Sequence, residues 1–391
     1  MRRWLLALAL ALLATGPAAA HKPSDAYLRL TLDPGAPPHG SLDVALRDLE
    51  LVVGLDGNGD GAVTWGELKA RHQAIAAYVQ SRLVLETTGG PCELRPVEHL
   101  VDVHADGTYA VLRFVAECPS SLDGLALRYG LLFDVDPTHR GLLTVSRAGA
   151  VTTAVLSPHQ PEIALGGSPA RSAALGAFFT LGLEHIAFGL DHLLFLLVLL
   201  LPAACRRAPG GAWLPVAGWS SAAVEMVKIL TAFTLAHGVS LTAATLGVVD
   251  LPTRLVESAI AATIVVTALD NVWPCLPGKR WLIAFGFGLI HGLGFASALG
   301  PMDLSPLDLA IALLGFNLGI EAGQVALALC GLAAIYPLRT LGLYARGLLP
   351  VGSAAALVLA GFWFVDRAFA GAITPSEAPG VCLASGSTRG R

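Results

Sequence analysis

The sequence predicts a membrane protein in which a β-rich exported domain with one EF-hand-like loop is followed by a six-helix transmembrane bundle. Composition is the first observation behind this fold class. Of the 391 residues, 54% are hydrophobic and 14% are charged, against roughly 25% charged in an ordinary soluble domain. The second observation is an apolar leader at residues 1–20, and the third is a series of long apolar segments within residues 172–369.

The leader has the parts of a secretory signal peptide. Arg2 and Arg3 precede an apolar run that begins at Trp4, and a small-residue cleavage site ends at Ala20. The run is too short to cross about 30 Å of hydrocarbon as an anchor helix. We therefore expect the mature chain to begin at His21, on the periplasmic side of a bacterial inner membrane.

Residues 21–165 form the expected exported domain. Apolar and polar residues alternate at 26–32 and 109–115, which predicts half-buried strands and a sandwich or small barrel. One helix is expected from about Glu67 to Arg82, because Thr64 and Glu67 have the spacing of a capping box.

The two cysteines and the charged residues of this domain give further expectations. Cys92 and Cys118 are its two cysteines, and we expect them to be bridged because disulfides form in the periplasm. Residues 21–165 carry 11 Lys/Arg and 18 Asp/Glu, whereas residues 166–391 carry 12 and 11. Neither part has the clustered basic face that a nucleic-acid backbone requires, so nucleic acid is excluded as a partner.

Residues 56–67 match the calcium-binding loop pattern D-x-[DN]-x-[DN]-G-x5-E. Gly61 permits the sharp turn of such a loop. The expected Ca²⁺ ligands are Asp56, Asn58, Asp60, the carbonyl of Ala62, Thr64 directly or through water, and Glu67. The alternative is a turn rich in Asp and Asn that holds no ion. Because the loop is single and exported, a structural site is favoured over a calcium sensor.

A linker rich in Pro and Gly at residues 166–171 separates this domain from the membrane part. Six later segments are long and apolar enough to cross a bilayer, namely residues 173–202, 222–248, 254–274, 281–300, 307–335 and 348–369. With the first domain outside, the inner loops carry Arg206, Lys279 and Arg339, in agreement with the positive-inside rule. The tail at residues 370–391 is then also periplasmic.

Polar side chains interrupt these apolar segments. Each is costly in a membrane unless it has a partner, so each is a candidate functional group. The first segment carries Glu184, His185, Asp191 and His192, and the second and fourth carry His237 and His291, each followed by a glycine that lets a helix or an ion approach. Further candidates are Glu257 in the third segment and, in the fifth, a stripe of Asn317, Glu321 and Gln324.

Four imidazoles with carboxylate and amide oxygens suit Ni²⁺, Co²⁺, Zn²⁺ or Cu²⁺ better than K⁺ or Mg²⁺. The sequence therefore predicts a path for a transition metal. One alternative is that these groups only form hydrogen bonds between helices. Another is a proton relay or catalysis, but no thiol, Ser-His pair or His-Glu-x-x-His spacing supports it. We predict that the protein is not an enzyme.

A second place for metal capture is the exported domain. Cleavage before His21 would leave an α-amine and an imidazole on one residue, a chelating pair for a copper-like ion. His104 and His139 could complete such a site. The alternative is that these histidines, like His99, are ordinary solvated loop residues.

Several motifs carry a resemblance to a known family. They are His185-x5-Asp191-His192 within Gly-x-Asp-His-Leu-Leu-Phe, Phe233-Thr234-Leu235-Ala236-His237, Gly288-x2-His291-Gly292-x-Gly294-Phe295 and Phe316-Asn317-Leu318-Gly319-Ile320-Glu321-x2-Gln324. Over residues 172–369 the chain resembles the HupE/UreJ family of hydrogenase- and urease-associated membrane proteins, which are regarded as nickel or cobalt permeases. The start at His21-Lys22-Pro23 and the exported domain resemble a longer branch of that family.

The resemblance implies Ni²⁺ or Co²⁺ as the transported ion and a hydrogenase, urease or other metalloenzyme maturation system as the partner. Together with the intramembrane ligands, it favours transport of a transition-metal cation across the inner membrane. The alternative is a metallochaperone or assembly factor that binds a metal, such as copper, for a partner enzyme without transporting it. His21 and the large exported domain favour that second hypothesis.

Overall fold

The structure is a computed structural model that describes residues 24–104, 107–119, 122–147, 150–165, 171–208, 212–273, 275–276, 279–295, 302 and 304–369. The expected signal peptide, His21 and the tail at 370–391 lie outside the described residues, as does nearly all of the linker at 166–171.

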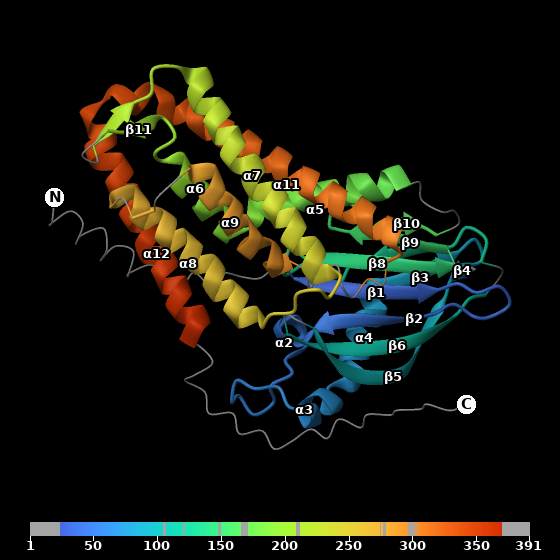
Figure 1. The fold of residues 1–391 in the computed structure, drawn as a ribbon. Coiled ribbons are helices and arrows are strands. Elements are labelled where there is room, and N and C mark those ends of the chain that lie inside the picture. Colours follow the sequence, from blue (N-terminus) through green and yellow to red (C-terminus); the bar gives the residue numbers. More distant parts are fainter. Residues whose placement is uncertain are drawn as a thin grey trace, which may run out of the picture.

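Two sheets form a sandwich in the first part of the chain (Figure 1). One sheet has the strand order β5-β6-β2-β1-β8-β9 and the other the order β10-β7-β3-β4. Neighbouring strands are antiparallel except β1 and β8, which are parallel. The strands are β1 Asp25–Thr31, β2 His39–Ala45, β3 Leu83–Thr87, β4 Gly90–Pro91, β5 Glu93–His104, β6 Gly107–Glu117, β7 Ala126–Tyr129, β8 Arg140–Arg147, β9 Ala150–Leu156 and β10 Glu162–Ala164.

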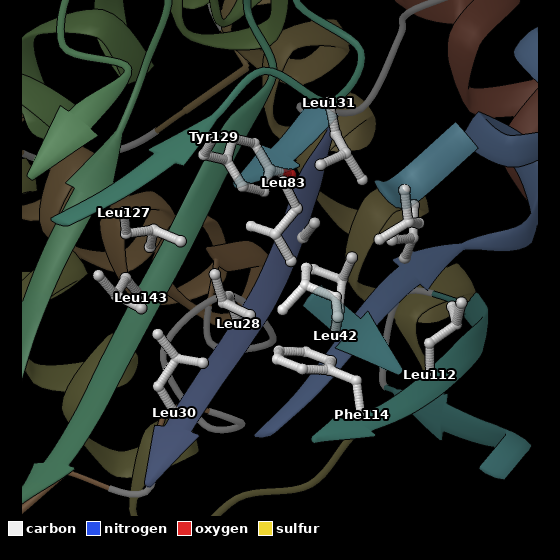
Figure 2. Packing of buried hydrophobic residues seen from close by; sticks show 14 of the residues in the cluster. Leu28, Leu30, Leu42, Leu83, Leu112, Phe114, Leu127, Tyr129, Leu131 and Leu143 are labelled. Carbon is white, nitrogen blue, oxygen red and sulfur yellow. The ribbon is translucent and has the colours of Figure 1, made fainter. Parts of the chain in front are cut away.

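The sandwich core consists mainly of leucine side chains from both sheets (Figure 2). Leu28 and Leu42 are opposite each other in the β1–β2 register, and they belong to the same buried cluster as Leu83 and Leu127 of the other sheet. Since alternate residues of a strand point to opposite faces, Tyr27 lies on the other face of β1, where it is also buried. That second face is covered by the helices of the membrane part.

Three short helices adjoin the candidate calcium loop in the sequence: α2 Leu46–Val53 precedes it, α3 Trp65–Ala70 begins within it and α4 His72–Arg82 follows. The predicted capping box of Thr64 and Glu67 is confirmed. The single helix expected at Glu67–Arg82 is wrong in one respect, because α3 ends at Ala70 and α4 starts again after Arg71, whose backbone is not α-helical. The predicted disulfide between Cys92 and Cys118 is present and joins the start of β5 to the end of β6.

The rest of the described chain is mainly helical (Figure 1). Helices α7 and α9, α5 and α11, and α8 and α12 pack against each other as pairs. A short hairpin of β11 and β12 connects α6 to α7. The elements are α5 Arg171–Phe188, α6 Leu190–Leu200, β11 Cys205–Arg207, β12 Trp213–Pro215, α7 Trp219–Thr245, α8 Thr253–Val272, α9 Arg280–Gly292, η1 Leu293–Phe295, α11 Pro306–Ile335, η3 Tyr336–Thr340, η4 Tyr344–Leu348 and α12 Leu349–Phe369.

The expectation of six uninterrupted membrane helices needs correction. Among the described residues, four helices are long and apolar enough to cross a membrane, namely Trp219–Thr245, Thr253–Val272, Pro306–Thr340 and Tyr344–Phe369. The expected first span is a pair of helices bent by 67°. Where the fourth span was expected, the described apolar helix is shorter, from Arg280 to Phe295.

The bend in the first span occurs at Gly189, between α5 and α6. The Gly189 N–H still bonds to the His185 carbonyl at 2.9 Å, but the backbone of Gly189 is extended. A Cβ atom at this position would lie 2.4 Å from the same carbonyl oxygen. Only glycine fits this close turn, and the turn changes the direction of the chain between His185 and His192.

Candidate metal centre

Four histidines from four helices meet beside this bend. They are His185 on α5, His192 on α6, His237 on α7 and His291 on α9. The His192 ring centroid lies 4.6 Å from that of His185, 6.2 Å from that of His237 and 5.2 Å from that of His291. Ligand atoms of His185, His192 and His237 all lie within 4.8 Å of one another. The structure thus brings together the four intramembrane histidines that the sequence indicated.

Most ring nitrogens in this group are buried and lack a hydrogen-bond partner. This holds for both nitrogens of His185, Nε2 of His192, Nε2 of His237 and Nδ1 of His291. A buried polar atom without a partner costs about 1–3 kcal/mol. Several such atoms in one place require an explanation, and a shared metal ion that accepts their lone pairs provides one.

Two of these histidines have a polar neighbour on their second ring nitrogen, which orients the ring. His237 Nδ1 lies 3.3 Å from Asn317 Oδ1, and His291 Nε2 lies 2.9 Å from Thr263 Oγ1. A partner on one ring nitrogen fixes the ring orientation and leaves the opposite nitrogen free for a metal. Thr263 was not among the residues that the sequence indicated.

Two glycines permit the close approach of α7 to α9 and to α11 that this arrangement needs. A Cβ atom on Gly292 would lie 2.2 Å from the His237 carbonyl oxygen. A Cβ atom on Gly238 would lie 3.1 Å from Asn317 Oδ1. The prediction that the glycine after each histidine serves close packing is confirmed.

The stripe on α11 faces α7, as Asn317, Glu321 and Gln324 all contact that helix. The Glu321 carboxylate accepts hydrogen bonds from the Thr231 hydroxyl at 2.5 Å and the Thr234 hydroxyl at 2.7 Å. Gln324 Nε2 donates to the same carboxylate at 2.9 Å. One helical turn separates Thr234 from His237, so this polar group continues the histidine cluster along α7.

Asp191 and Glu257 occupy a different place. The Asp191 carboxylate is bound by Arg367 of α12, whose Nη2 lies 3.0 Å from both oxygens. Arg367 Nη1 also donates to the backbone carbonyl of Glu257 at 3.4 Å. Asp191 therefore faces α12 rather than the histidines. Arg367 lies 176 residues from Asp191 in sequence, and no local pattern indicated this pairing.

Glu184 also has a distant partner. Arg140 of β8 donates from Nε to the Glu184 carboxylate at 2.8 Å, and its Nη1 donates to the carbonyls of Pro137 and His139. The Arg140 side chain is only 6% exposed. The sandwich is thus attached directly to the turn of α5 that carries His185.

Two stacked phenylalanine rings adjoin the cluster. The Phe295 and Phe316 centroids are 4.3 Å apart with an interplanar angle of 7°. The His185 centroid lies 4.8 Å from Phe295 and 5.3 Å from Phe316. Both phenylalanines belong to the hydrophobic cluster that includes Tyr27 and Tyr109 of the sandwich, so apolar packing links the histidines to the sandwich.

The candidate calcium loop at residues 56–67 has an ordered network of backbone hydrogen bonds. Asp56 accepts from the N–H groups of Gly59 and Gly61, and Glu67 accepts from those of Gly57 and Thr64. The Gly61 N–H lowers the pKa of Asp56, and the Thr64 N–H lowers the pKa of Glu67. Both carboxylates are therefore ionised near neutral pH. Gly61 has a φ of +82°, as the sharp turn of the loop requires.

The remaining expected loop ligands form part of the same network. Asn58 Oδ1 accepts from the Asp60 N–H, and Asp60 Oδ1 accepts from the Ala62 N–H. The Thr64 hydroxyl donates to Glu67. An oxygen-rich, acidic loop of this kind fits the preference of Ca²⁺ for six to eight oxygen ligands.

The two described histidines of the expected capture site have partners inside the sandwich. His139 is fully buried, with Nδ1 2.5 Å from Ser24 Oγ and Nε2 2.7 Å from the Tyr129 hydroxyl. Burial lowers the pKa of His139 to about 3. His104 stacks on Tyr109 with centroids 4.1 Å apart. His21, the third residue of that hypothesis, lies outside the described residues.

Comparison with known families agrees with this geometry. A family model described as HupE / UreJ protein matches residues 164–367. The matched range contains the four clustered histidines and the polar stripe on α11. No curated protein is significantly similar to the chain.

Proposed function

The chain belongs to the HupE/UreJ family, and on this premise we propose that it carries a transition-metal cation, Ni²⁺ or Co²⁺, across the bacterial inner membrane. The family is linked to nickel or cobalt uptake or to accessory roles. One observation carries the proposal for this chain. Four histidines from four helices converge with five buried ring nitrogens that lack a hydrogen-bond partner.

The ligand chemistry supports a borderline divalent ion. Neutral imidazoles bind Ni²⁺, Co²⁺, Zn²⁺ and Cu²⁺ well, because their lone pairs replace water without adding charge. Glu321 of α11 adds a carboxylate next to α7, where Thr231, Thr234 and Gln324 donate hydrogen bonds to it. Weak, successive ligands favour passage over permanent binding.

The sandwich side offers an approach to the cluster. A cavity of about 440 Å³ lies between β9 and α5, and its wall includes Arg140, Thr180 and Glu184. The stacked Phe295 and Phe316 adjoin His185 and pack against the sandwich. Glu184 of the cavity wall directly precedes His185 in α5, so the cavity reaches the helical turn that carries one of the four histidines.

Transport by the purified full-length protein in vesicles tests the proposal. Wild-type protein should move external Ni²⁺ or Co²⁺ to a metal-sensitive dye inside, and His192→Ala should abolish this movement. The matched control is His99→Ala, because His99 lies in the sandwich on β5. If His192→Ala transports as well as wild type, the intramembrane histidines are structural and the proposal fails.

An assembly factor that binds metal for a hydrogenase, urease or other partner enzyme is the second candidate function. The observation that favours it is the direct attachment of the sandwich to the turn carrying His185, through Arg140 and Glu184. Such a protein would bind metal in the vesicle experiment without moving it. Copper binding without nickel or cobalt binding would also support this second function.

We further propose that Ca²⁺ occupies the loop at residues 56–67 and stabilises the sandwich. An ion bound only by the folded state raises stability by mass action. Calcium should therefore raise the melting temperature of the sandwich relative to chelator, and Glu67→Gln should remove this difference. Identical melting with calcium and with chelator in the wild type would exclude a functional site.

The orientation proposed for the chain places the sandwich in the periplasm and the loops with Arg206, Lys279 and Arg339 in the cytoplasm. Contacts of Arg339 and Tyr344 with the segment around β11 and β12 support a common end for these loops. A cysteine introduced beside Lys279 should resist a membrane-impermeant thiol reagent in spheroplasts. Its labelling from outside would contradict this orientation.

A further inference from the structure

A second cavity is lined by residues of β11, α7 and α9. The strand β11 lies at the end of the helices far from the sandwich (Figure 1). The volume of the cavity is about 670 Å³. Three arginines, Arg206, Arg207 and Arg280, line it together with Glu225 and Asp270. This concentration of positive charge does not suit a transition-metal cation, so the cavity calls for a different ligand.

Arg207 is held in place but retains an unused donor. Its guanidinium carbon lies 4.5 Å from the centre of the Trp213 ring, and Nη2 donates to the Asp270 carbonyl. Its Nε is buried and has no hydrogen-bond partner among the described residues. A guanidinium fixed in this way is oriented in advance for an anion.

Arg280 begins α9 and is partly buried. Within the described part of the chain no side chain lies within hydrogen-bond distance of its guanidinium, and the charges of Asp270 and Glu225 act on it from farther away. Asp270 Oδ1 lies 3.9 Å from Arg207 Nη1 and also accepts from the N–H groups of Cys275 and Leu276 at 3.0 Å each, so one acid faces the three arginines from within the cavity wall. Glu225 lies 3.7 Å from Lys228. The arginine charge in the cavity is therefore only partly compensated.

The rest of the cavity wall is mainly apolar and includes residues of α7. Leu199, Met226 and Ile229 line it, and so does Val224, which is 67% exposed. A basic pocket next to an exposed apolar helix surface has the two surfaces that a phospholipid needs. The arginines match its phosphate, and the apolar residues match its acyl chain.

We propose that this cavity binds the phosphate of an anionic phospholipid such as phosphatidylglycerol. Arg207 and Arg280 donate to the phosphate oxygens, in the charge-assisted geometry that guanidinium groups favour. An acyl chain lies along α7 over Val224. This lipid site is independent of metal binding, because the four histidines belong to another part of the helix bundle and do not line the cavity.

Binding to the purified full-length protein in a neutral detergent tests the proposal. Native mass spectrometry should show a phosphatidylglycerol adduct on the wild type that phosphatidylcholine does not match. Arg207→Gln and Arg280→Gln should each weaken that adduct by about tenfold or more, as expected for the loss of a charge-assisted hydrogen bond. Unchanged size-exclusion elution and Ni²⁺ binding would show that the variants are folded.

Arg346→Gln is the matched control, because Arg346 is an exposed arginine on η4, near the same end of the helices, and does not line the cavity. It should bind phosphatidylglycerol as the wild type does. Equal losses in all three variants would overturn the proposal in favour of diffuse surface attraction. Displacement of the lipid by millimolar inorganic phosphate, with equal protection of the protein against heat, would overturn it in favour of a free anion.

Discussion

At the residue scale, Asp191 shows how a predicted ligand can have another function. Both of its carboxylate oxygens lie 3.0 Å from Nη2 of Arg367, so the side chain faces α12. It lies directly before His192, so the ion pair holds the first turn of α6 and thereby the direction of the His192 ring. We therefore expect Asp191 to position a metal ligand rather than to bind metal itself.

This role predicts that Asp191→Asn and Arg367→Gln each weaken Ni²⁺ binding and that the double variant is no weaker than either single one. Breaking one pair removes the same constraint whichever partner is changed, so the effects are not additive. Each single change should reduce the free energy of Ni²⁺ binding by about 1.5–3 kcal/mol, the usual contribution of a hydrogen bond to a charged group. Isothermal titration with Ni²⁺ measures this. Additive losses would instead indicate that Asp191 contacts the metal.

His139 predicts a specific pH dependence for the sandwich. Its folded pKa is about 3 because burial disfavours the imidazolium, whereas the unfolded value is about 6.5. The unfolded state therefore binds the proton first, and the stabilisation is complete above pH 6.5 and is lost as the pH falls toward 3. The free energy of unfolding should decrease by about 1.4 kcal/mol per pH unit in this window.

Pulse proteolysis in urea at pH 7 and pH 5 measures this decrease on the full chain. His139→Gln should have a lower urea midpoint at pH 7, because it loses the fit to Ser24 and Tyr129, and its midpoint should change less with pH. A wild-type midpoint that is equal at both pH values would show that His139 is protonated in the folded sandwich.

At the element scale, the contact between α7 and α9 determines the distance between His237 and His291. A Cβ atom on Gly292 would lie 2.2 Å from the His237 carbonyl oxygen, which belongs to rigid backbone. Gly292→Ala should therefore push the helices apart and destabilise the protein by about 1–3 kcal/mol. It should also weaken Ni²⁺ binding, because two ligand rings separate.

Gly286→Ala is a control on the same helix, because a Cβ atom there would meet nothing within 4 Å. Alanine favours helix relative to glycine, so this variant should be as stable as the wild type or more stable. Thermal denaturation in detergent, followed by aggregation, ranks the three proteins. A Gly292→Ala variant as stable as Gly286→Ala would show that the close contact is not required.

The sequence predicted much of this site because each polar residue stood out in an apolar segment. The stripe of Asn317, Glu321 and Gln324 also follows from helical spacing alone, and all three contact α7. The bend at Gly189 could not be predicted, because the interval between His185 and His192 fits a straight helix equally well. The two sides of the bend are also bound by distant arginines, since Arg140 binds Glu184 and Arg367 binds Asp191, 44 and 176 residues away in sequence.

At the scale of the whole molecule, the sandwich and the helices are joined by more than the linker. Tyr27, Tyr109 and Leu142 of the sandwich share a hydrophobic cluster with Phe178, Phe295 and Phe316 of the helical part. Within this contact, the Thr144 hydroxyl donates to the Met302 carbonyl at 3.1 Å. Arg140 and Glu184 add a partly buried ion pair beside the histidine cluster. A change in the sandwich can thus reach His185 through its neighbour Glu184.

The Arg140 contact predicts an effect that crosses from one part of the molecule to the other. Arg140→Gln should weaken the attachment of the sandwich to α5 by about 1.5–3 kcal/mol, because the Glu184 carboxylate loses its charged donor. Peptides from α5 should then exchange hydrogen for deuterium faster, and Ni²⁺ should bind the histidines less tightly although no ligand is altered. Arg113→Gln is the matched control, since Arg113 pairs with Glu98 on the exposed surface of the sandwich and such pairs contribute less than about 1 kcal/mol.

If Arg140→Gln accelerates exchange in α5 but leaves Ni²⁺ binding unchanged, the sandwich supports the helix without influencing the histidine cluster. Unchanged values for both would mean that the apolar contact alone holds the two parts together.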